Sequence, residues 1–185
     1  MSNEKALKLY NVKKYRTPDG YTSDIAIFTI PSNEKIKTHM LDIKILLIQR
    51  SVTDSEGRPN IEAGKWALPG GFVNPDETAF ECAKRELTEE TSVEISHLEH
   101  FGVYDQPGRD PRGWIISNAH LALVPENKLT KRRANDDASD AQLFSINEVF
   151  KMDIAFDHAQ IINDGLNVIK SKFIEMGNSK DLPLA

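Results

Sequence analysis

Arg85-Glu86-Leu87-Thr88-Glu89-Glu90 is the stretch of this chain that says most about its fold and its chemistry. If the stretch is helical, about 3.6 residues per turn place Glu86, Glu89 and Glu90 within one arc of roughly 100°. Carboxylates this close on one helix face repel each other by roughly 0.2–0.5 kcal/mol per pair. A hard cation such as Mg²⁺ or Mn²⁺, which prefers oxygen ligands, offsets that repulsion. The stretch therefore predicts a metal-binding helix.

The residues before this stretch supply the start of the helix. After Pro75, either Asp76 or Thr78 can cap its N-terminus, and Thr78 with Glu81 fits a capping box. The helix is then expected to run to about residue 91. An apolar stripe beside the carboxylate arc gives it a buried face, formed by Ala79, Ala83 and Leu87.

Apolar segments on both sides of this helix indicate a sheet. Runs rich in β-branched and aliphatic residues predict strands at 25–30, 43–48, 65–68, 98–104, 114–124 and 143–145. Helical spacing predicts two further helices at 147–152 and 157–173. Polar runs predict loops at 31–38, 54–64, 105–113 and 127–140, and the third strand is expected to stop at Pro69-Gly70-Gly71. Single helices between groups of strands favour mixed strands packed against helices in layers, an α/β/α sandwich or a similar α+β fold.

Length, charge and cysteine content limit the classes of protein. A chain of 185 residues fits one domain, and we expect a single domain over 1–176 followed by a flexible tail at 177–185. The net charge of −5 argues against a general nucleic-acid binder. The start has no secretory signal, and no apolar run is long enough to span a membrane. One cysteine excludes an intrachain disulfide, which suits the cytoplasm.

The spacing of the acidic helix resembles the Nudix box of the Nudix hydrolases. That pattern has Gly, five residues, Glu, seven residues, then Arg-Glu-apolar-x-Glu-Glu-x-Gly-apolar. It is matched here by Gly71, Glu77, Arg85, Glu86, Leu87, Glu89, Glu90 and Val93. Ser92 departs from it, because the family usually has Gly where the helix ends in a left-handed residue. The resemblance implies a Nudix-type α/β/α sandwich with a mixed sheet and Mg²⁺-dependent, or alternatively Mn²⁺-dependent, diphosphate hydrolysis.

The resemblance also implies roles for single residues. Glu86, Glu89 and Glu90 would bind the metal, with the Gly70 carbonyl as a further ligand. Arg85 would pair with these carboxylates and hold their rotamers. Gly71 and Glu77 would support them, Glu77 either through Arg85 or through a water on the metal. Glu81 and Lys84, on the opposite side of the helix, are expected to form an ordinary solvated face.

A second motif lies between residues 105 and 114, in Asp105-Gln106-Pro107-Gly108-Arg109-Asp110-Pro111-Arg112-Gly113-Trp114. Arg109 and Arg112 can clamp phosphates, and Asp110 stands between them. On composition alone, a surface turn with a local Arg–Asp pair is the competing interpretation. The loop, and residues 154–159, are similar to Nudix proteins of NAD metabolism, which include ADP-ribose pyrophosphatases and ADP-ribose-sensing transcriptional regulators.

These resemblances imply an enzyme that cleaves the diphosphate of ADP-ribose, or of a related nucleotide, to AMP and a sugar phosphate. One alternative is a nucleoside triphosphate pyrophosphohydrolase, including one that acts on oxidised nucleotides. Another is an ADP-ribose sensor with little turnover. The regulators carry a C-terminal winged-helix domain, whereas only about a dozen residues follow the last predicted helix here, so an enzyme is expected. The family further implies a homodimer, while the net charge and the short apolar runs lead us to expect no nucleic acid or membrane as partner.

Weaker candidates complete the set. A general base or extra metal ligand is one interpretation of the acidic loop residues Asp136, Asp137 and Asp140, and a solvated acidic loop is the other. His158 is expected to be structural, although substrate contact is the alternative. Arg50 is expected either to reach a phosphate or to lie in solvent. Trp66 and Trp114 could each stack on adenine, and packing in the core is the other interpretation. Cys82 is expected to pack in the interior.

Overall fold

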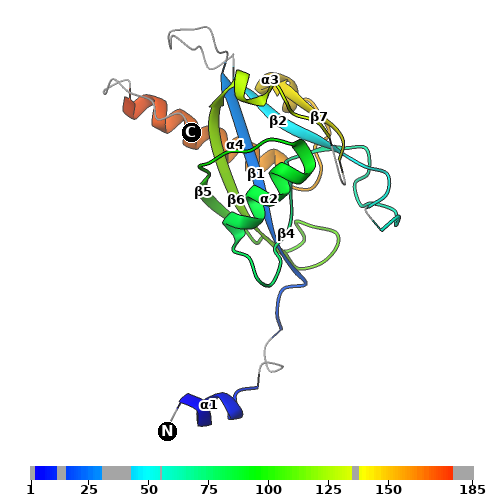
Figure 1. The fold of residues 1–185 in the computed structure, drawn as a ribbon, viewed down its shortest axis with the longest axis vertical. Coiled ribbons are helices and arrows are strands. Elements are labelled where there is room, and N and C mark those ends of the chain that lie inside the picture. The colour runs from blue at the N-terminus through cyan, green and yellow to red at the C-terminus, as the bar shows by residue number, and fades with distance from the viewer. Residues whose placement is uncertain (1–2, 12–15, 31–42, 55, 135–137, 177–185) are drawn as a thin grey trace.

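The computed structural model describes residues 3–11, 16–30, 43–54, 56–134 and 138–176 (Figure 1). In chain order the elements are α1 (Asn3–Leu9), β1 (Gly20–Ile30), β2 (Lys44–Arg50), β3 (Trp66–Ala67), β4 (Gly70–Phe72), α2 (Ala79–Thr91), β5 (Glu99–Tyr104), β6 (Ile115–Pro125), the 3₁₀-helix η3 (Glu126–Leu129), β7 (Ala138–Ser145), α3 (Ile146–Val149) and α4 (His158–Met176).

The strands form one mixed sheet. Its central order is β3-β2-β1-β6-β5, with β4 paired to β1 and β7 paired to β2. β1 and β6 run parallel, whereas the other pairs are antiparallel. The two central strands, β1 and β6, therefore lie side by side over their whole length, and the predicted mixed sheet is confirmed.

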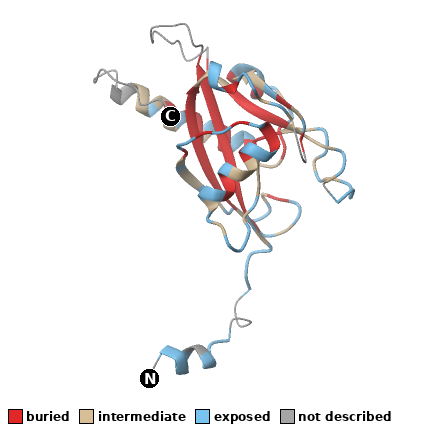
Figure 2. Ribbon diagram, viewed as in Figure 1, coloured by how far each residue is buried: buried red, intermediate tan, exposed pale blue. Residues whose placement is uncertain are grey.

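Helices cover both faces of this sheet. Figure 1 shows α2 in front of β1 and β6, with α4 behind them. Alternate residues of β1 serve the two layers, because successive side chains of a strand point to opposite faces. Ile25 and Ile27 pack with Leu87 of α2, whereas Ala26 and Phe28 pack in the cluster that includes α4. Figure 2 shows the central strands buried along their length, and the predicted sandwich is confirmed.

The described elements differ from the sequence prediction at several points, and α1 was not predicted. β1 begins at Gly20, earlier than predicted. Thr22, Ser23 and Asp24 are buried although they are polar, so the apolar pattern that predicts strands did not include them. The predicted strand at 65–68 stops before Pro69 as expected, but Gly70 and Gly71 then belong to a further strand, β4, and pair with Asp24 and Ser23. The predicted loop at 127–140 contains η3 and the start of β7. The predicted loop at 31–38 lies outside the described residues.

Gly70 explains why glycines can form a strand here. A Cβ on Gly70 would lie 2.4 Å from the carbonyl oxygen of Ser23, and its φ of +155° is one that other residues rarely adopt. Only a residue without a side chain lets β4 approach β1 this closely. The close approach brings the β4–α2 segment over the sheet.

α2 begins and ends as local chemistry requires. Thr78 caps it with the predicted capping box, in which the Thr78 side chain and Glu81 satisfy each other's backbone N–H groups. Its C-terminal cap is Ser92, with φ 56° and ψ 22°, whose N–H donates to the Thr88 carbonyl. Ser92 thus adopts the left-handed conformation that glycine provides without a steric penalty.

Two organisational expectations stay predictions. Figure 1 shows α1 apart from the layered body, so the packing of the elements does not test the prediction of a single domain over 1–176. The predicted tail at 177–185 lies outside the described residues. Among the described residues, no helix is both long and apolar enough to cross a membrane.

Ser92→Gly should stabilise the protein by roughly 1 kcal/mol, because it removes the Cβ that makes a left-handed residue unfavourable. Urea unfolding followed by circular dichroism measures the free energy of unfolding. Ser96→Gly is the control, since Ser96 is exposed and has no positive φ. A Ser92→Gly protein no more stable than the Ser96→Gly protein would contradict the strain assigned to this turn.

Candidate active site

Gly71 and Glu86 place α2 against β4. A Cβ on Gly71 would lie 2.3 Å from Oε1 of Glu86, so a side chain at 71 would occupy the position of the carboxylate. The Glu86 side chain is only 13% exposed. The predicted supporting role of Gly71 thus has a steric basis: its missing side chain leaves room for a candidate metal ligand.

Arg85 holds the acidic side chains of this segment together. Its Nε and Nη2 donate to the two oxygens of Glu77 at 3.0 and 2.6 Å. Its Nη1 donates to Glu86 at 2.7 Å and to Glu89 at 2.9 Å, while Nη2 also reaches the Phe72 carbonyl at 3.1 Å. Hydrogen bonds from Arg85 lower the pKa of Glu77 to about 2. The guanidinium therefore fixes the rotamers of three carboxylates.

Glu90 is the buried carboxyl of the helix. Its Oε2 accepts the Gly70 N–H at 2.9 Å, and the residue is only 4% exposed. Burial raises its pKa well above the usual value, and repulsion from Glu86 and Asp24 adds to this. A buried carboxyl with two acidic neighbours is the environment that a bound cation would relieve.

The donor set fits a hard divalent cation. Glu86, Glu89 and Glu90 offer oxygen atoms only, beside the backbone of Gly70. Within the described part of the chain, no group of three or more acidic, histidine or cysteine side chains already converges around one point. Arg85 binds Oε1 of Glu86 and Oε2 of Glu89, so a cation would share these two carboxylates with the guanidinium.

Asp24 lies at the floor of a pocket beside this helix. Its carboxylate accepts a hydrogen bond from the Ser117 hydroxyl and lies 3.7 Å from Nε2 of His158. Nδ1 of His158 accepts the Leu68 N–H at 2.9 Å, so the neutral ring carries its proton on Nε2, facing Asp24. Burial lowers the pKa of His158, which keeps the ring neutral. The predicted structural role of His158 fits this geometry.

The loop at 105–114 forms one wall of the pocket with two arginines in different settings. Arg109 is buried and makes a bidentate pair with Asp157, at 2.7 and 2.6 Å. Arg112 donates to Asp110 from its Nε and from its Nη2, the latter at 2.7 Å. Although burial alone raises the pKa of Asp110, these bonds hold it below the usual value. Both guanidiniums are thus oriented by carboxylates.

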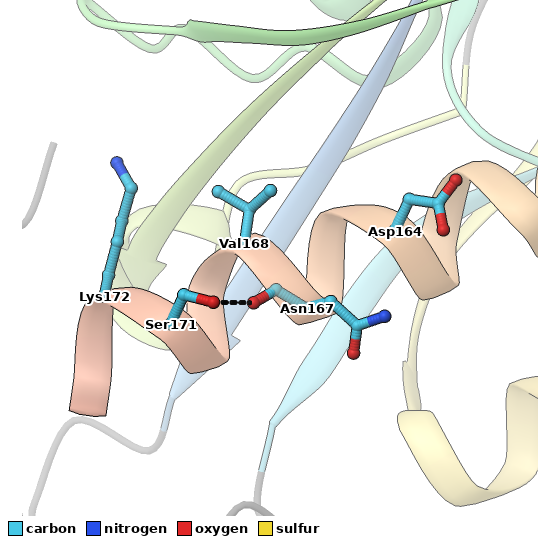
Figure 3. Close-up of a pocket in the computed structure, with 5 residues that line it drawn as sticks. All are labelled: Asp164, Asn167, Val168, Ser171 and Lys172. Carbon is cyan, nitrogen blue, oxygen red and sulfur yellow. Dashed lines mark hydrogen bonds between the residues drawn. The ribbon is translucent and has the colours of Figure 1, made fainter. Parts of the chain in front are cut away.

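The pocket brings together half of the predicted site residues, namely Gly70, Gly71, Arg109, Asp110 and Arg112, whereas the predicted charged residues of α2 do not line it. Its lining residues are Thr22, Asp24, Arg50, Leu68, Gly70, Gly71, Phe72, Arg109, Asp110, Arg112, Phe156 and His158. Through Gly70 and Gly71 it adjoins Glu90 and Glu86. A separate hollow along α4, lined by Asp164, Asn167, Val168, Ser171 and Lys172 (Figure 3), contains no predicted site residue.

The weaker candidates fall in other environments. Burial raises the pKa of Cys82 to about 12, which suits packing and opposes nucleophilic chemistry. Trp66 packs edge-on against Phe144 at 4.6 Å in the core. Trp114 is 38% exposed, outside the lining of the pocket beside α2. Asp140 belongs to β7 and accepts the Ala141 N–H, away from that lining, whereas 136 and 137 lie outside the described residues.

Five residues that line the pocket were not among the predicted site residues, namely Thr22, Asp24, Leu68, Phe72 and Phe156. Phe72 and Phe156 read as ordinary hydrophobic residues. Asp24 precedes an apolar strand, and a charged residue at the start of such a strand is the signal that could have found it, because aspartate is rarely buried without a partner.

Comparisons of its sequence and of its structure show which known proteins this chain resembles. The sequence model of the NUDIX domain matches residues 24–165. An ADP-ribose pyrophosphatase of Methanocaldococcus jannaschii is 36% identical over 162 residues, which cover 88% of this chain and 83% of that protein.

Two further relatives extend the comparison. The ADPR responsive transcriptional repressor NtrR of Acinetobacter baylyi is 30% identical over 92% of this chain, which spans 62% of the repressor. The crystal structure of a mutT/nudix family protein from Listeria innocua superposes with a TM-score of 0.72 at 48% identity, covering 86% of this chain and 99% of that one.

Glu77→Gln should lower the free energy of unfolding by about 2 kcal/mol at pH 7, because a charged hydrogen-bond partner of Arg85 is lost. The folded-state pKa of Glu77, about 2, lies below the usual 4.5. Its contribution is therefore complete above about pH 4.5 and is lost as the pH falls toward 2. Urea unfolding in EDTA across this range measures the difference between variant and wild type. Glu94→Gln, at an exposed site, is the control; a pH-independent difference for Glu77→Gln would refute the assignment.

Proposed function

The chain belongs to the NUDIX family, and from this premise we propose that it hydrolyses the diphosphate of ADP-ribose to AMP and ribose 5-phosphate. Water adds to one phosphorus, the bond from that phosphorus to the bridging oxygen breaks, and the other phosphate leaves. The observation that carries the proposal is the group of carboxylates arranged by Arg85 beside a pocket that three arginines line. The similarity to an ADP-ribose pyrophosphatase over 88% of the chain supports the substrate.

We propose Mg²⁺, or alternatively Mn²⁺, as the cofactor. Glu86, Glu89, Glu90 and the Gly70 carbonyl would hold it, in keeping with their oxygen-only chemistry. When bound, such an ion neutralises phosphate charge and lowers the pKa of a water molecule. Glu90 supports this assignment, because its burial, and after that its acidic neighbours Glu86 and Asp24, disfavour its ionised form unless a cation is near.

Arg85 and its partners prepare this site. Nη1 of Arg85 holds Glu86 and Glu89 in fixed rotamers, and Glu77 accepts hydrogen bonds from Nε and Nη2 of the same guanidinium. Preorganised ligands need less reordering when a cation binds. Arg85 thus acts on the reaction by positioning the carboxylates.

Arg109, Asp110 and Arg112 are proposed to bind the substrate. All three line the pocket beside Gly70 and Gly71. Arg109 brings positive charge to a wall that also holds Asp24, while Asp110 orients Arg112. The anionic group of a substrate in this pocket would lie between Arg109 and, beyond Gly70 and Gly71, the carboxylate helix.

Two other functions are alternative candidates, each for a stated reason. The similarity to an ADPR responsive repressor favours an ADP-ribose sensor with little turnover as the second candidate. The box alone is equally compatible with nucleoside triphosphate hydrolysis to monophosphate and pyrophosphate. We further propose a cytoplasmic homodimer that requires neither nucleic acid nor a membrane, on the strength of the family resemblance, the negative net charge and the single cysteine.

Purified protein with Mg²⁺ should convert ADP-ribose to equimolar AMP and ribose 5-phosphate, as measured by chromatography with phosphate-ester standards. EDTA should abolish the reaction, and added Mg²⁺ should restore it. Glu89→Gln and Glu90→Gln should each lower kcat by about a hundredfold or more, because charge stabilisation at the phosphates is lost.

Glu81→Gln is the matched control on the same helix, since glutamine can also complete the capping box. Faster cleavage of nucleoside triphosphates than of ADP-ribose would replace the proposed substrate. Tight ADP-ribose binding without products would favour the sensor. Near-normal turnover in both site variants would overturn the assignment of the carboxylates.

A further inference from the structure

Four side chains from four separate segments form a stack in the pocket. The guanidinium carbon of Arg112 lies 5.0 Å from the ring centroid of Phe72 and 5.0 Å from that of Phe156. The guanidinium carbon of Arg50 lies 5.0 Å from the same Phe156 ring. Aromatic rings and planar cations therefore alternate in the order Phe72, Arg112, Phe156, Arg50, and all four line the pocket.

Arg112 takes part in this stack through its faces. Its Nε and Nη2, at the edge of the guanidinium plane, donate to the carboxylate of Asp110, which also accepts the Arg112 backbone N–H at 2.8 Å. A guanidinium whose edge is held by a carboxylate presents its flat faces, which attract aromatic rings. The setting of Arg112 is thus that of a stacking layer.

Phe156 is held in this stack at a conformational cost. Its φ is +53°, in the left-handed region that bulky residues rarely adopt. The backbone on either side is fixed, because Ala155 donates to the Trp66 carbonyl at 2.9 Å and His158 is buried. A strained aromatic residue between two arginines in a pocket points to a use in ligand recognition.

Phe72 is the end of the stack that reaches solvent. It is 45% exposed, although it belongs to β4 and directly follows Gly70 and Gly71. Its carbonyl accepts a hydrogen bond from Arg85, which ties its position to the carboxylate helix. The exposed ring of Phe72 therefore directly follows Gly71, the residue that leaves room for the candidate metal ligand Glu86.

We infer that this stack is a base-binding site, in which a flat heteroaromatic ring of a nucleotide lies on Phe72 as the next layer. Arg112 then supports the base through Phe72 instead of clamping a phosphate. Stacking chemistry by itself selects a planar aromatic group. That the group is adenine rests on the proposed function, in which the substrate is ADP-ribose.

Isothermal titration with AMP and with ribose 5-phosphate separates base recognition from phosphate recognition. Phe72→Leu keeps apolar bulk but removes the ring, so it should weaken AMP binding about tenfold and leave ribose 5-phosphate binding unchanged. Arg112→Lys keeps the charge but removes the plane, so it should do the same. Phe150→Leu is the matched control, because Phe150 is 47% exposed and lies outside the pocket lining.

The outcomes separate this inference from the proposed function. Unchanged AMP binding in Phe72→Leu, or no AMP binding to the wild type, would overturn the base site even if ADP-ribose is hydrolysed. Equal weakening of both ligands by Arg112→Lys would make Arg112 a phosphate clamp. Loss of AMP binding in Trp114→Leu, with Phe72→Leu normal, would move the base to Trp114. If the wild type leaves ADP-ribose intact, the proposed function fails, and selective loss of AMP binding in Phe72→Leu would still support the base site.

Discussion

The set of hydrogen bonds that Arg85 makes is the interaction on which the rest of this site depends. One guanidinium reaches Glu77, Glu86 and Glu89 and also the carbonyl of Phe72, so it links α2 to β4. Bidentate charge-assisted bonds of this kind are directional as well as strong. They hold together carboxylates that would otherwise repel, and they leave the carboxylates in place for a cation to take over.

The sheet sets the second condition, because the carboxylate helix has to lie close to it. Gly70 and Gly71 make this possible, the first by letting β4 approach β1 and the second by leaving room for Glu86. Glu90 is enclosed in the same region, and its burial raises its pKa, to which repulsion from Glu86 and Asp24 adds. The repulsion between the carboxylates of this site is therefore a consequence of how closely the backbone segments pack. A cation is the partner that would relieve it.

The sequence predicted the local features of this structure better than its long-range ones. The capping box of Thr78, the helix and the glycine-dependent site all follow from residues within one segment, where spacing determines which side chains meet. The polar start of β1 was missed because Asp24 is satisfied by Ser117, which lies 93 positions along the chain. The stack around Arg112 was missed for the same reason, since four distant segments supply it. The spacing of residues along the chain does not predict contacts between segments that are so far apart in the sequence.

The central claim is that the carboxylates arranged by Arg85 form a site for a divalent cation. Titration of nucleotide-free protein with Mn²⁺, followed by the electron paramagnetic resonance of the free ion, measures this without any turnover. The account predicts saturable binding that Glu86→Gln and Glu90→Gln each weaken at least about tenfold, while Glu81→Gln leaves it unchanged. Binding that is equally strong in all three variants, or absent from the wild type, would contradict the account.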